Sequence, residues 1–314
     1  MGEKEKLNGL HGYNLQNPKF KFCENIKNLM QIIPGSQGLL GVKLSRLTGF
    51  SLGYVQLEKL PSGEKYIRVP QPPENAVIVN SLAYKPDEMI MESILIAETL
   101  REYGSKKVYG VFPYMPYSRK RFIKGEAFPA KTLISNFFSV FDKIYVVDYH
   151  LEDYINEISK KIEIYNISAM EKLAEVAESL DVKDPIVVSP DEEGVRWASR
   201  FSKKLNIDYF YLTKIRVDAE NVVIASKPPD VKDRDIFIVD DMISAGSTVI
   251  QAVKVLKKAK CRKIYVFSTH VLAKTETLRK IYEVGVEEIY GTDTVPSPVS
   301  KVSVSELIAK ALKS

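Results

Sequence analysis

The sequence predicts an α/β protein of two domains, each built on a mostly parallel sheet flanked by helices. Three observations favour this fold class. Short apolar runs alternate with amphipathic stretches along the chain, which is the pattern of strands joined by helices. The 314 residues exceed one typical domain and fit two. The two halves of the chain also resemble each other, which indicates an internal duplication.

The first half contains four short, continuous apolar runs, which predict buried parallel strands at residues 29–34, 75–81, 107–112 and 144–148. The stretch after the second run has apolar residues at helical spacing, namely Ile90, Ile94, Ala97 and Leu100. We therefore expect an amphipathic helix there. The polar loop AYKPDE joins it to the preceding strand.

The second half follows the same order. Apolar runs predict strands at residues 184–189, 235–239 and 263–269. Helices are expected at residues 194–205 and 248–258, and the second of them has an apolar stripe formed by Val249, Ala252, Val253 and Leu256. Residues 78–112 and 238–267 follow one pattern, and each ends in a lysine-led strand. Any two strand–helix–strand units look somewhat alike, but this shared ending favours duplication.

Composition and charge exclude several classes of protein. The net charge of +5 comes from 45 basic and 40 acidic side chains that are interspersed, so we expect no nucleic-acid partner. The sequence has no run of about eighteen apolar residues, and the polar residues 1–28 read as a surface extension rather than a secretion signal. Cys23 and Cys261 form no CxxC pair. We therefore expect a cytoplasmic protein without a membrane partner.

The segment IVDDMISAGSTV, at residues 238–249, carries the strongest chemical signal. An apolar strand ends in two carboxylates, Asp240 and Asp241, and a turn of small residues then leads into a helix. The turn and the helix start offer backbone N–H groups and hydroxyls to a phosphate, from Ser244, Ala245, Gly246, Ser247 and Thr248. The small residues alone would suit an ordinary capped turn. Two acids beside a phosphate cradle instead indicate contacts to sugar hydroxyls or to Mg²⁺.

Other polar residues lie at strand ends or in loops, where the residue type alone does not distinguish a functional role from a structural one. His150 and Asp191 each follow a predicted strand, and Lys214 and Arg216 are spaced to point to one side of an extended segment. A single histidine is more often structural, a strand-end carboxylate is common without any metal, and a basic pair is usually solvated. Arg119 could equally be a surface charge.

The turn at residues 238–249 resembles the ribose-phosphate-binding loop of phosphoribosyltransferases, and more closely that of ribose-phosphate pyrophosphokinases. The latter are built from two duplicated phosphoribosyltransferase-type domains, which agrees with the repeat in this chain. The segment GTDTVPSPVSKVSVSELIAKAL, at residues 291–312, resembles the C-terminal signature of the archaeal type. The resemblance covers the chain from Ile33 to the C-terminus.

The resemblance implies a domain organisation. After an extension at residues 1–28, we expect an N-terminal domain at 29–163 and a C-terminal domain with the ribose-phosphate loop at 164–302. In the family the C-terminal helix, here residues 303–314, packs on the first domain.

The resemblance also implies an activity, namely Mg²⁺-dependent diphosphoryl transfer from ATP to ribose 5-phosphate by a homo-oligomer. Asp240, Asp241 and residues 244–248 would bind the ribose phosphate. Arg119, His150 and Glu64 would bind the nucleotide, with Glu64 reaching the site of a neighbouring subunit. A pyrophosphate loop would comprise Asp191, Glu192, Glu193 and Gly194. His150 and Asp191 would hold the metal, and Lys214 and Arg216 would be catalytic.

The chain departs from the family pattern at several positions. The family's Thr-Gly-Gly-Thr reads Ala245 to Thr248 here, and Glu193 replaces a glycine. On the nucleotide side, Phe-x-Asp-Gly-Glu reads LPSGE at residues 60–64, and the stretch after Arg119 is shorter by two residues. The nucleotide site is therefore divergent. Two alternatives to the synthase follow, namely a non-catalytic regulatory paralogue and a phosphoribosyltransferase.

Overall fold

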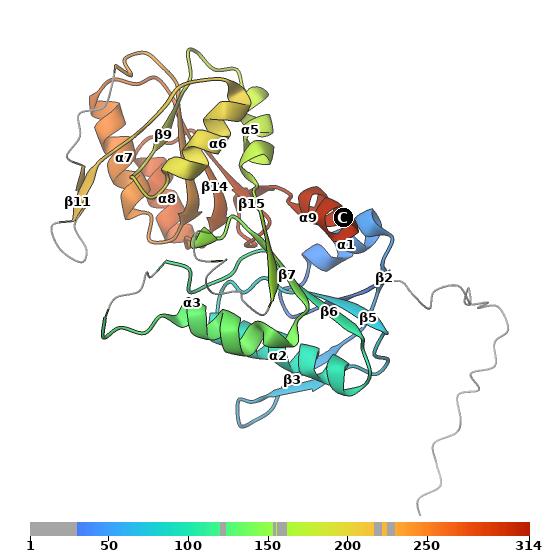
Figure 1. Ribbon diagram of the computed structural model, residues 1–314. Helices are drawn as coiled ribbons and strands as arrows, with labels where there is room; N and C mark the ends of the chain where they lie inside the picture. The colour runs from blue at the N-terminus through green and yellow to red at the C-terminus, as the bar shows by residue number, and fades with distance from the viewer. Residues whose placement is uncertain (1–29, 120–123, 153–154, 156–161, 217–221, 225–229) are drawn as a thin grey trace, which may run out of the picture.

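The computed structural model describes residues 30–119, 124–152, 155, 162–216, 222–224 and 230–314. These residues form two α/β halves, which Figure 1 shows one above the other. The first sheet has the strand order β2-β1-β5-β6-β7-β8, and every neighbouring pair is parallel. Its strands are β1 (Gln31–Pro34), β2 (Ser51–Leu52), β5 (Asn75–Val79), β6 (Lys107–Phe112), β7 (Lys143–Val147) and β8 (Glu163–Ile167).

The second sheet repeats this topology, with the order β10-β9-β13-β14-β15-β16 and parallel pairing throughout. Its strands are β9 (Ile186–Ser189), β10 (Tyr209–Tyr211), β13 (Ile236–Ile243), β14 (Ile264–Val271), β15 (Glu288–Thr292) and β16 (Ser300–Val302). Each half also contains one antiparallel hairpin, formed by β3 (Gln56–Lys59) with β4 (Lys65–Arg68) and by β11 (Lys214–Arg216) with β12 (Val222–Ile224). The equal strand orders support the duplication.

Helices cover both faces of each sheet, as parallel strands require. On the first sheet, one face packs against α2 (Pro86–Glu102) and the segment formed by α3 (Pro129–Thr132), η1 (Leu133–Phe137) and η2 (Phe138–Val140). On the second sheet, the matching face packs against α7 (Ser247–Lys258) and α8 (Thr275–Glu283). In the described part of the chain, no helix is long and apolar enough to cross a membrane.

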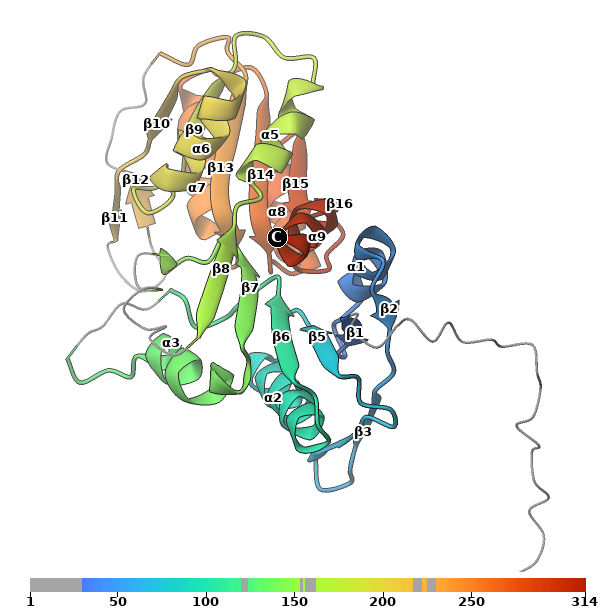
Figure 2. The ribbon, with the colours of Figure 1, turned by 45° about the vertical axis from the view of Figure 1, so that its right-hand side comes forward.

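Two of the other helices are exchanged between the halves. Helix α5 (Met170–Glu178) follows the last strand of the first sheet, yet it packs beside α6 (Val195–Leu205) on the second sheet. Helix α9 (Ser305–Lys313) follows the last strand of the second sheet and packs beside α1 (Leu40–Thr48) on the first. Figure 2 shows α9 next to α1. Each half therefore receives one helix from the other.

The predicted elements match the observed ones closely, because the apolar runs are the buried strands. The stripe of α7 is buried as expected, whereas Ile94 on α2 is only partly buried. Strand β13 continues through both carboxylates to Ile243, because Met242 and Ile243 still pair with β14. Strand β8 belongs to the first sheet through its pairing with β7, so the sheet changes after Ile167 rather than at the expected boundary after residue 163.

Candidate functional site

A cavity of about 400 Å³ lies at the carboxyl ends of the second sheet's strands, where ligands bind in open α/β sheets. Both halves of the protein contribute to its walls. The first half supplies Arg119 and His150. The second half supplies the loop after β9, the end of β13 and the start of α7, namely Asp191, Glu193, Asp240, Asp241, Met242, Ile243, Ser244, Ala245, Gly246, Ser247, Thr248 and Val249. Most of the residues predicted to act together are thus brought together.

The turn between β13 and α7 depends on one glycine. Gly246 has a φ of +76°, and a Cβ atom there would lie 2.6 Å from Cγ2 of Thr277. Both facts exclude larger residues without a shift of the turn. Ser247 is the first residue of α7 and lies outside the left-handed region, so serine is acceptable where the family has glycine. Backbone N–H groups at this helix start remain available to an anion.

The two carboxylates at the end of β13 differ in charge. Burial and the neighbouring Asp241 and Asp191 raise the pKa of Asp240 well above its ordinary value. Burial, the largest single influence, would raise the pKa of Asp241, but the hydrogen bond and charge interaction with His150, together with His270 and Asp240, outweigh burial and lower that pKa. The pair therefore combines an ionised Asp241 with an Asp240 that retains its proton more readily.

His150 from the first half is held by residues of the second. Its Nδ1 lies 2.8 Å from Oδ2 of Asp241, and its ring centre lies 5.3 Å from that of Trp197. The guanidinium of Arg196 donates a hydrogen bond to the main-chain carbonyl of His150. His150 is therefore part of a junction between the halves at the edge of the cavity.

The loop after β9 is fixed by its own hydrogen bonds. The Ser189 hydroxyl donates to the carbonyl of Asp191 at 2.6 Å, and the N–H of Gly194 donates to Oδ1 of Asp191 at 3.2 Å. Asp191 is buried and lines the cavity, as does the exposed Glu193. Glu192 is exposed and is not among the residues that line it. The loop thus presents acidic side chains to the cavity.

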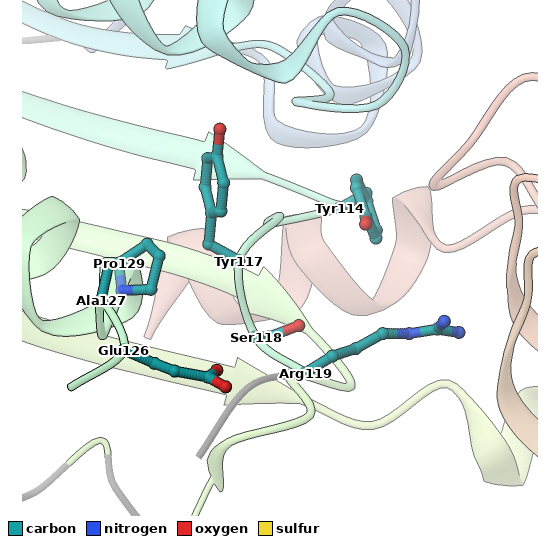
Figure 3. Close-up of a pocket in the computed structure, with 7 residues that line it drawn as sticks. All are labelled: Tyr114, Tyr117, Ser118, Arg119, Glu126, Ala127 and Pro129. Atoms are coloured by element: carbon teal, nitrogen blue, oxygen red, sulfur yellow. The ribbon is translucent and has the colours of Figure 1, made fainter. Parts of the chain in front are cut away.

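A second cavity, of about 530 Å³, adjoins the first at Arg119. It is lined by Tyr114, Tyr117, Ser118, Arg119, Glu126, Ala127 and Pro129. In Figure 3 the Arg119 side chain extends away from Ala127 and Pro129. Because Arg119 lines both cavities, one ligand with an aromatic end and an anionic end could occupy them together.

Glu64 lines neither of these cavities. Glu64 lies in the turn of the β3–β4 hairpin, where the Ser62 hydroxyl donates to its carboxylate at 2.6 Å. Figure 1 places β3 at the end of the first half that is remote from the second. Lys214 and Arg216 lie on β11, an extended strand as expected, paired with β12. The predicted roles of these three residues remain predictions.

The sequence patterns do not single out Arg196, Trp197 or His270. Trp197 is the only tryptophan of the chain and is 1% exposed. His270 is buried between the halves, with Nε2 3.0 Å from the carbonyl of Val147 and Nδ1 2.9 Å from the Thr294 hydroxyl. Arg196 and Trp197 directly follow the predicted pyrophosphate loop, which was the one available signal.

A buried carboxylate strengthens the same junction. Asp148, at the end of β7, accepts hydrogen bonds from the hydroxyls of Ser168 and Thr269 and from the N–H of Ala169. Burial nevertheless raises the pKa of Asp148 to about 6. Burial likewise lowers the pKa of His270 to about 4. The halves thus meet through a polar network that is enclosed by protein.

Comparisons with known proteins agree with this architecture. A family model described as the phosphoribosyl transferase domain matches residues 159–300. A second model, described as the N-terminal domain of ribose phosphate pyrophosphokinase, matches residues 30–139. Together the two models cover both halves of the molecule.

Similar proteins match over nearly the whole chain. Ribose-phosphate pyrophosphokinase 1 of Archaeoglobus fulgidus is 40% identical over 90% of this chain and 99% of its own length. Ribose-phosphate pyrophosphokinase of Methanothermobacter thermautotrophicus is 35% identical over 82% of this chain and 91% of its own. The crystal structure of phosphoribosylpyrophosphate synthetase from Mycobacterium smegmatis superposes with a TM-score of 0.80 at 20% identity. It covers 91% of this chain and 98% of that one, which supports the fold.

Proposed function

This chain belongs to the archaeal-type ribose-phosphate pyrophosphokinase family, and we propose that it transfers a diphosphoryl group from ATP to ribose 5-phosphate. The products are phosphoribosyl pyrophosphate and AMP. The observation that carries the proposal is the pair of adjoining cavities, which suits two anionic substrates placed end to end.

Ribose 5-phosphate fits the cavity at the end of β13. Its phosphate would accept hydrogen bonds from the backbone of the turn at residues 244–248 and from the hydroxyls of Ser244, Ser247 and Thr248. Its ring hydroxyls would donate to the ionised Asp241 and bind Asp240. The acid pair lies beside the sugar in this arrangement, so it does not repel the phosphate.

ATP would place its base in the cavity lined by Tyr114 and Tyr117 and extend its phosphates past Arg119 toward His150. The guanidinium of Arg119 suits phosphate oxygens because it presents several N–H donors in one plane. The cavity holds aromatic rings of its own, although the family's aromatic residue is Leu60 in this chain. Binding of the base therefore does not depend on Leu60.

Mg²⁺ is compatible with the residues of this site. In the described part of the chain, no three His, Cys, Asp or Glu side chains are grouped to hold a metal ion. A Mg²⁺ ion shared with substrate phosphates needs only one or two protein ligands, and Asp191 and His150 line the same cavity. When bound, the ion would neutralise charge on the transferred phosphates.

The reaction requires the sugar's C1 oxygen to attack the β-phosphorus of ATP, while the bond between this phosphorus and the oxygen of the α-phosphate breaks. AMP leaves with that bridging oxygen, and the hydroxyl proton is released. Asp240 and Asp241 would orient the ribose, and Arg119 would orient the nucleotide. Lys214 and Arg216 on β11 would stabilise the transferred group. Catalysis rests on placement and charge.

The test is a phosphorus NMR assay with ribose 5-phosphate, Mg²⁺ and ATP. The expected result is AMP together with a new 1-diphosphate sugar signal, and D241N should abolish both. No turnover together with measurable binding to an active synthase would indicate a regulatory paralogue. Pyrophosphate release from phosphoribosyl pyrophosphate and a free base would indicate a phosphoribosyltransferase. We also propose a homo-oligomer, which light scattering tests directly.

A further inference from the structure

We propose that Arg196 is a positioning residue, which fixes the His150 loop of the first half onto the active cavity of the second. The inference rests on the proposed function in one respect, namely that His150 acts on a substrate bound in that cavity. It goes beyond that function because it identifies the contact that assembles the site from two halves.

Arg196 stands one residue into α6, directly after the loop of Asp191 to Gly194 that borders the cavity. Its guanidinium donates a hydrogen bond to the main-chain carbonyl of His150. The guanidinium carbon also lies 4.2 Å from the centre of the Trp197 ring. A planar cation stacked on an aromatic ring has little freedom to turn, so the donor is fixed in direction.

Two further contacts complete the hold on His150. Trp197, which is almost fully buried, packs against the imidazole with ring planes 30° apart. Asp241 holds Nδ1 at 2.8 Å. All three contacts come from the second half, whereas His150 follows β7 of the first sheet. Because a carboxylate only accepts hydrogen bonds, Nδ1 of His150 is the donor in this contact, and His150 itself lines the cavity.

The neighbouring Arg200 supplies a matched control. It lies one turn further along α6 and also bridges to the loop after β7, with its guanidinium 3.2 Å from the Glu152 carboxylate. This pair is exposed, at 42% and 34% of the two side chains. Exposed ion pairs contribute little to the stability of a fold. Removal of Arg200 therefore tests a bridge between the same two elements that does not touch His150.

The experiment compares R196M, R196K and R200M. Methionine keeps the length of the side chain but removes the donor and the charge, while lysine keeps a donor but loses the planar stack. We expect R196M to lower kcat/KM by about 10- to 100-fold, mostly in kcat, since a misplaced group slows chemistry more than binding. R196K should recover part of this loss, and R200M should stay within about twofold of the parent protein.

A second measurement does not depend on turnover. NMR of protein labelled with ¹⁵N-histidine shows which ring nitrogen carries a proton, and the chain has only three histidines. An H150Q variant assigns the His150 signals. In the parent protein we expect one fixed tautomer protonated at Nδ1, in R196M a mixture, and in R200M the parental pattern.

The two measurements separate the two claims. If R196M keeps the parental tautomer and the parental kcat/KM, Arg196 does not position His150 and the inference is overturned. If R200M disturbs His150 as much as R196M does, the effect is general to the bridge and the inference also fails. If the parent protein has no turnover but R196M still releases the His150 ring, the positioning role stands and the proposed activity fails.

Discussion

The two halves of this molecule share one topology but use the equivalent turn in opposite ways. In the second half, the turn between β13 and α7 is built of small residues and borders an open cavity. In the first half, the turn between β5 and α2 carries Tyr84 and Lys85, both with left-handed backbone. Helix α2 then begins with Pro86, followed by acidic residues. A proline and acids at a helix start do not favour a phosphate.

The first half buries a carboxylate beside the ends of β1 and β5. Glu92 on α2 is fully buried and accepts hydrogen bonds from the N–H of Ser36 at 2.7 Å and the Ser36 hydroxyl at 2.5 Å. Asn80 donates to it at 3.2 Å, and Lys65 lies 2.7 Å away. When the turns are aligned from Asn80 and Asp240 onward, Glu92 corresponds to the buried Ala252. The first half thus binds an internal anion through the turn after β1, whereas the turn after β13 borders a cavity that is open to an external one.

The largest expected effect comes from removing that internal anion. In E92A the ammonium of Lys65 and the donors of Ser36 lose their partner. We expect a loss of about 3–5 kcal/mol in the free energy of unfolding, as for one half of a buried ion pair. Urea denaturation measures it, with S93A as the neighbouring control. Affinity for ribose 5-phosphate should be unchanged if the two turns are independent, and a loss below about 1 kcal/mol would contradict the internal-anion interpretation.

The second residue of each turn also differs, being Ser81 in the first half and Asp241 in the second. The contacts of this residue make the stability of the protein depend on pH through His270. Ser81, the counterpart of Asp241, donates to the carbonyl of Thr294, whose hydroxyl binds His270. Burial lowers the pKa of His270 to about 4, although Asp241 opposes this; Arg119 lowers the pKa further. The unfolded chain therefore takes up a proton first as the pH falls. His270 should cost up to about 3 kcal/mol of stability between pH 6.5 and 4.

Unfolding of the parent protein and of H270Q across this pH range tests the prediction. Glutamine keeps a donor for the carbonyl of Val147 but does not titrate. Asp148 changes stability in the opposite direction, since burial raises its pKa to about 6, but it is present in both proteins. The difference between the two curves therefore isolates His270. Parallel curves would show that His270 does not couple folding to pH.

The open turn should be sensitive to a single methyl group. G246A places Cβ against Thr277 and requires a left-handed alanine. We expect an affinity for ribose 5-phosphate at least about tenfold weaker by calorimetry, since the turn must shift. G49A is the matched control, because Gly49 has a φ of +80° but no atom within 4 Å of the added Cβ. Equal affinities for G246A and the parent protein would exclude this turn as the phosphate site.

A hydroxyl at position 245 should add one phosphate contact to the turn after β13, with a modest gain in affinity. A245T restores the hydroxyl that the family pattern has at this position, and Ala245 is exposed toward the cavity. One further hydrogen bond to a charged group should tighten ribose 5-phosphate binding by about threefold to tenfold. A245V has the same shape without the hydroxyl and should show no gain. Equal gains in both variants would attribute the effect to shape.

Most of the fold was predictable because the burial of its strands and helices follows from short-range patterns of apolar residues. The continuous runs at 107–112 and 144–148 are strands β6 and β7 to within one residue. The stripe of Val249 to Leu256 is buried because its spacing matches one helix face. These signals need no knowledge of distant residues.

The contacts that assemble the site were less predictable, because they join residues far apart in the sequence. His150 and Asp241 are separated by 91 positions, and Ser36 and Glu92 by 56. No local sequence pattern distinguishes Arg196, which donates a hydrogen bond to the carbonyl of His150, from Arg200, which forms an exposed ion pair. Asp240 and Asp241 could be singled out as candidates because they are adjacent in the chain. The expected role of Glu64 depends on contacts outside both described cavities, and the roles of Lys214 and Arg216 stay predictions.

The exchange of α5 and α9 has a consequence for anyone who divides this protein. A fragment that stops before α5 contains the first sheet but lacks α9, which covers one face of that sheet and lies at the far end of the chain. Apolar side chains such as Leu40, Leu44 and Val77 then meet water. The complementary fragment would keep α5 and α6 but end in an α9 with nothing to pack against. Co-expressed fragments should rescue each other, whereas either alone should aggregate.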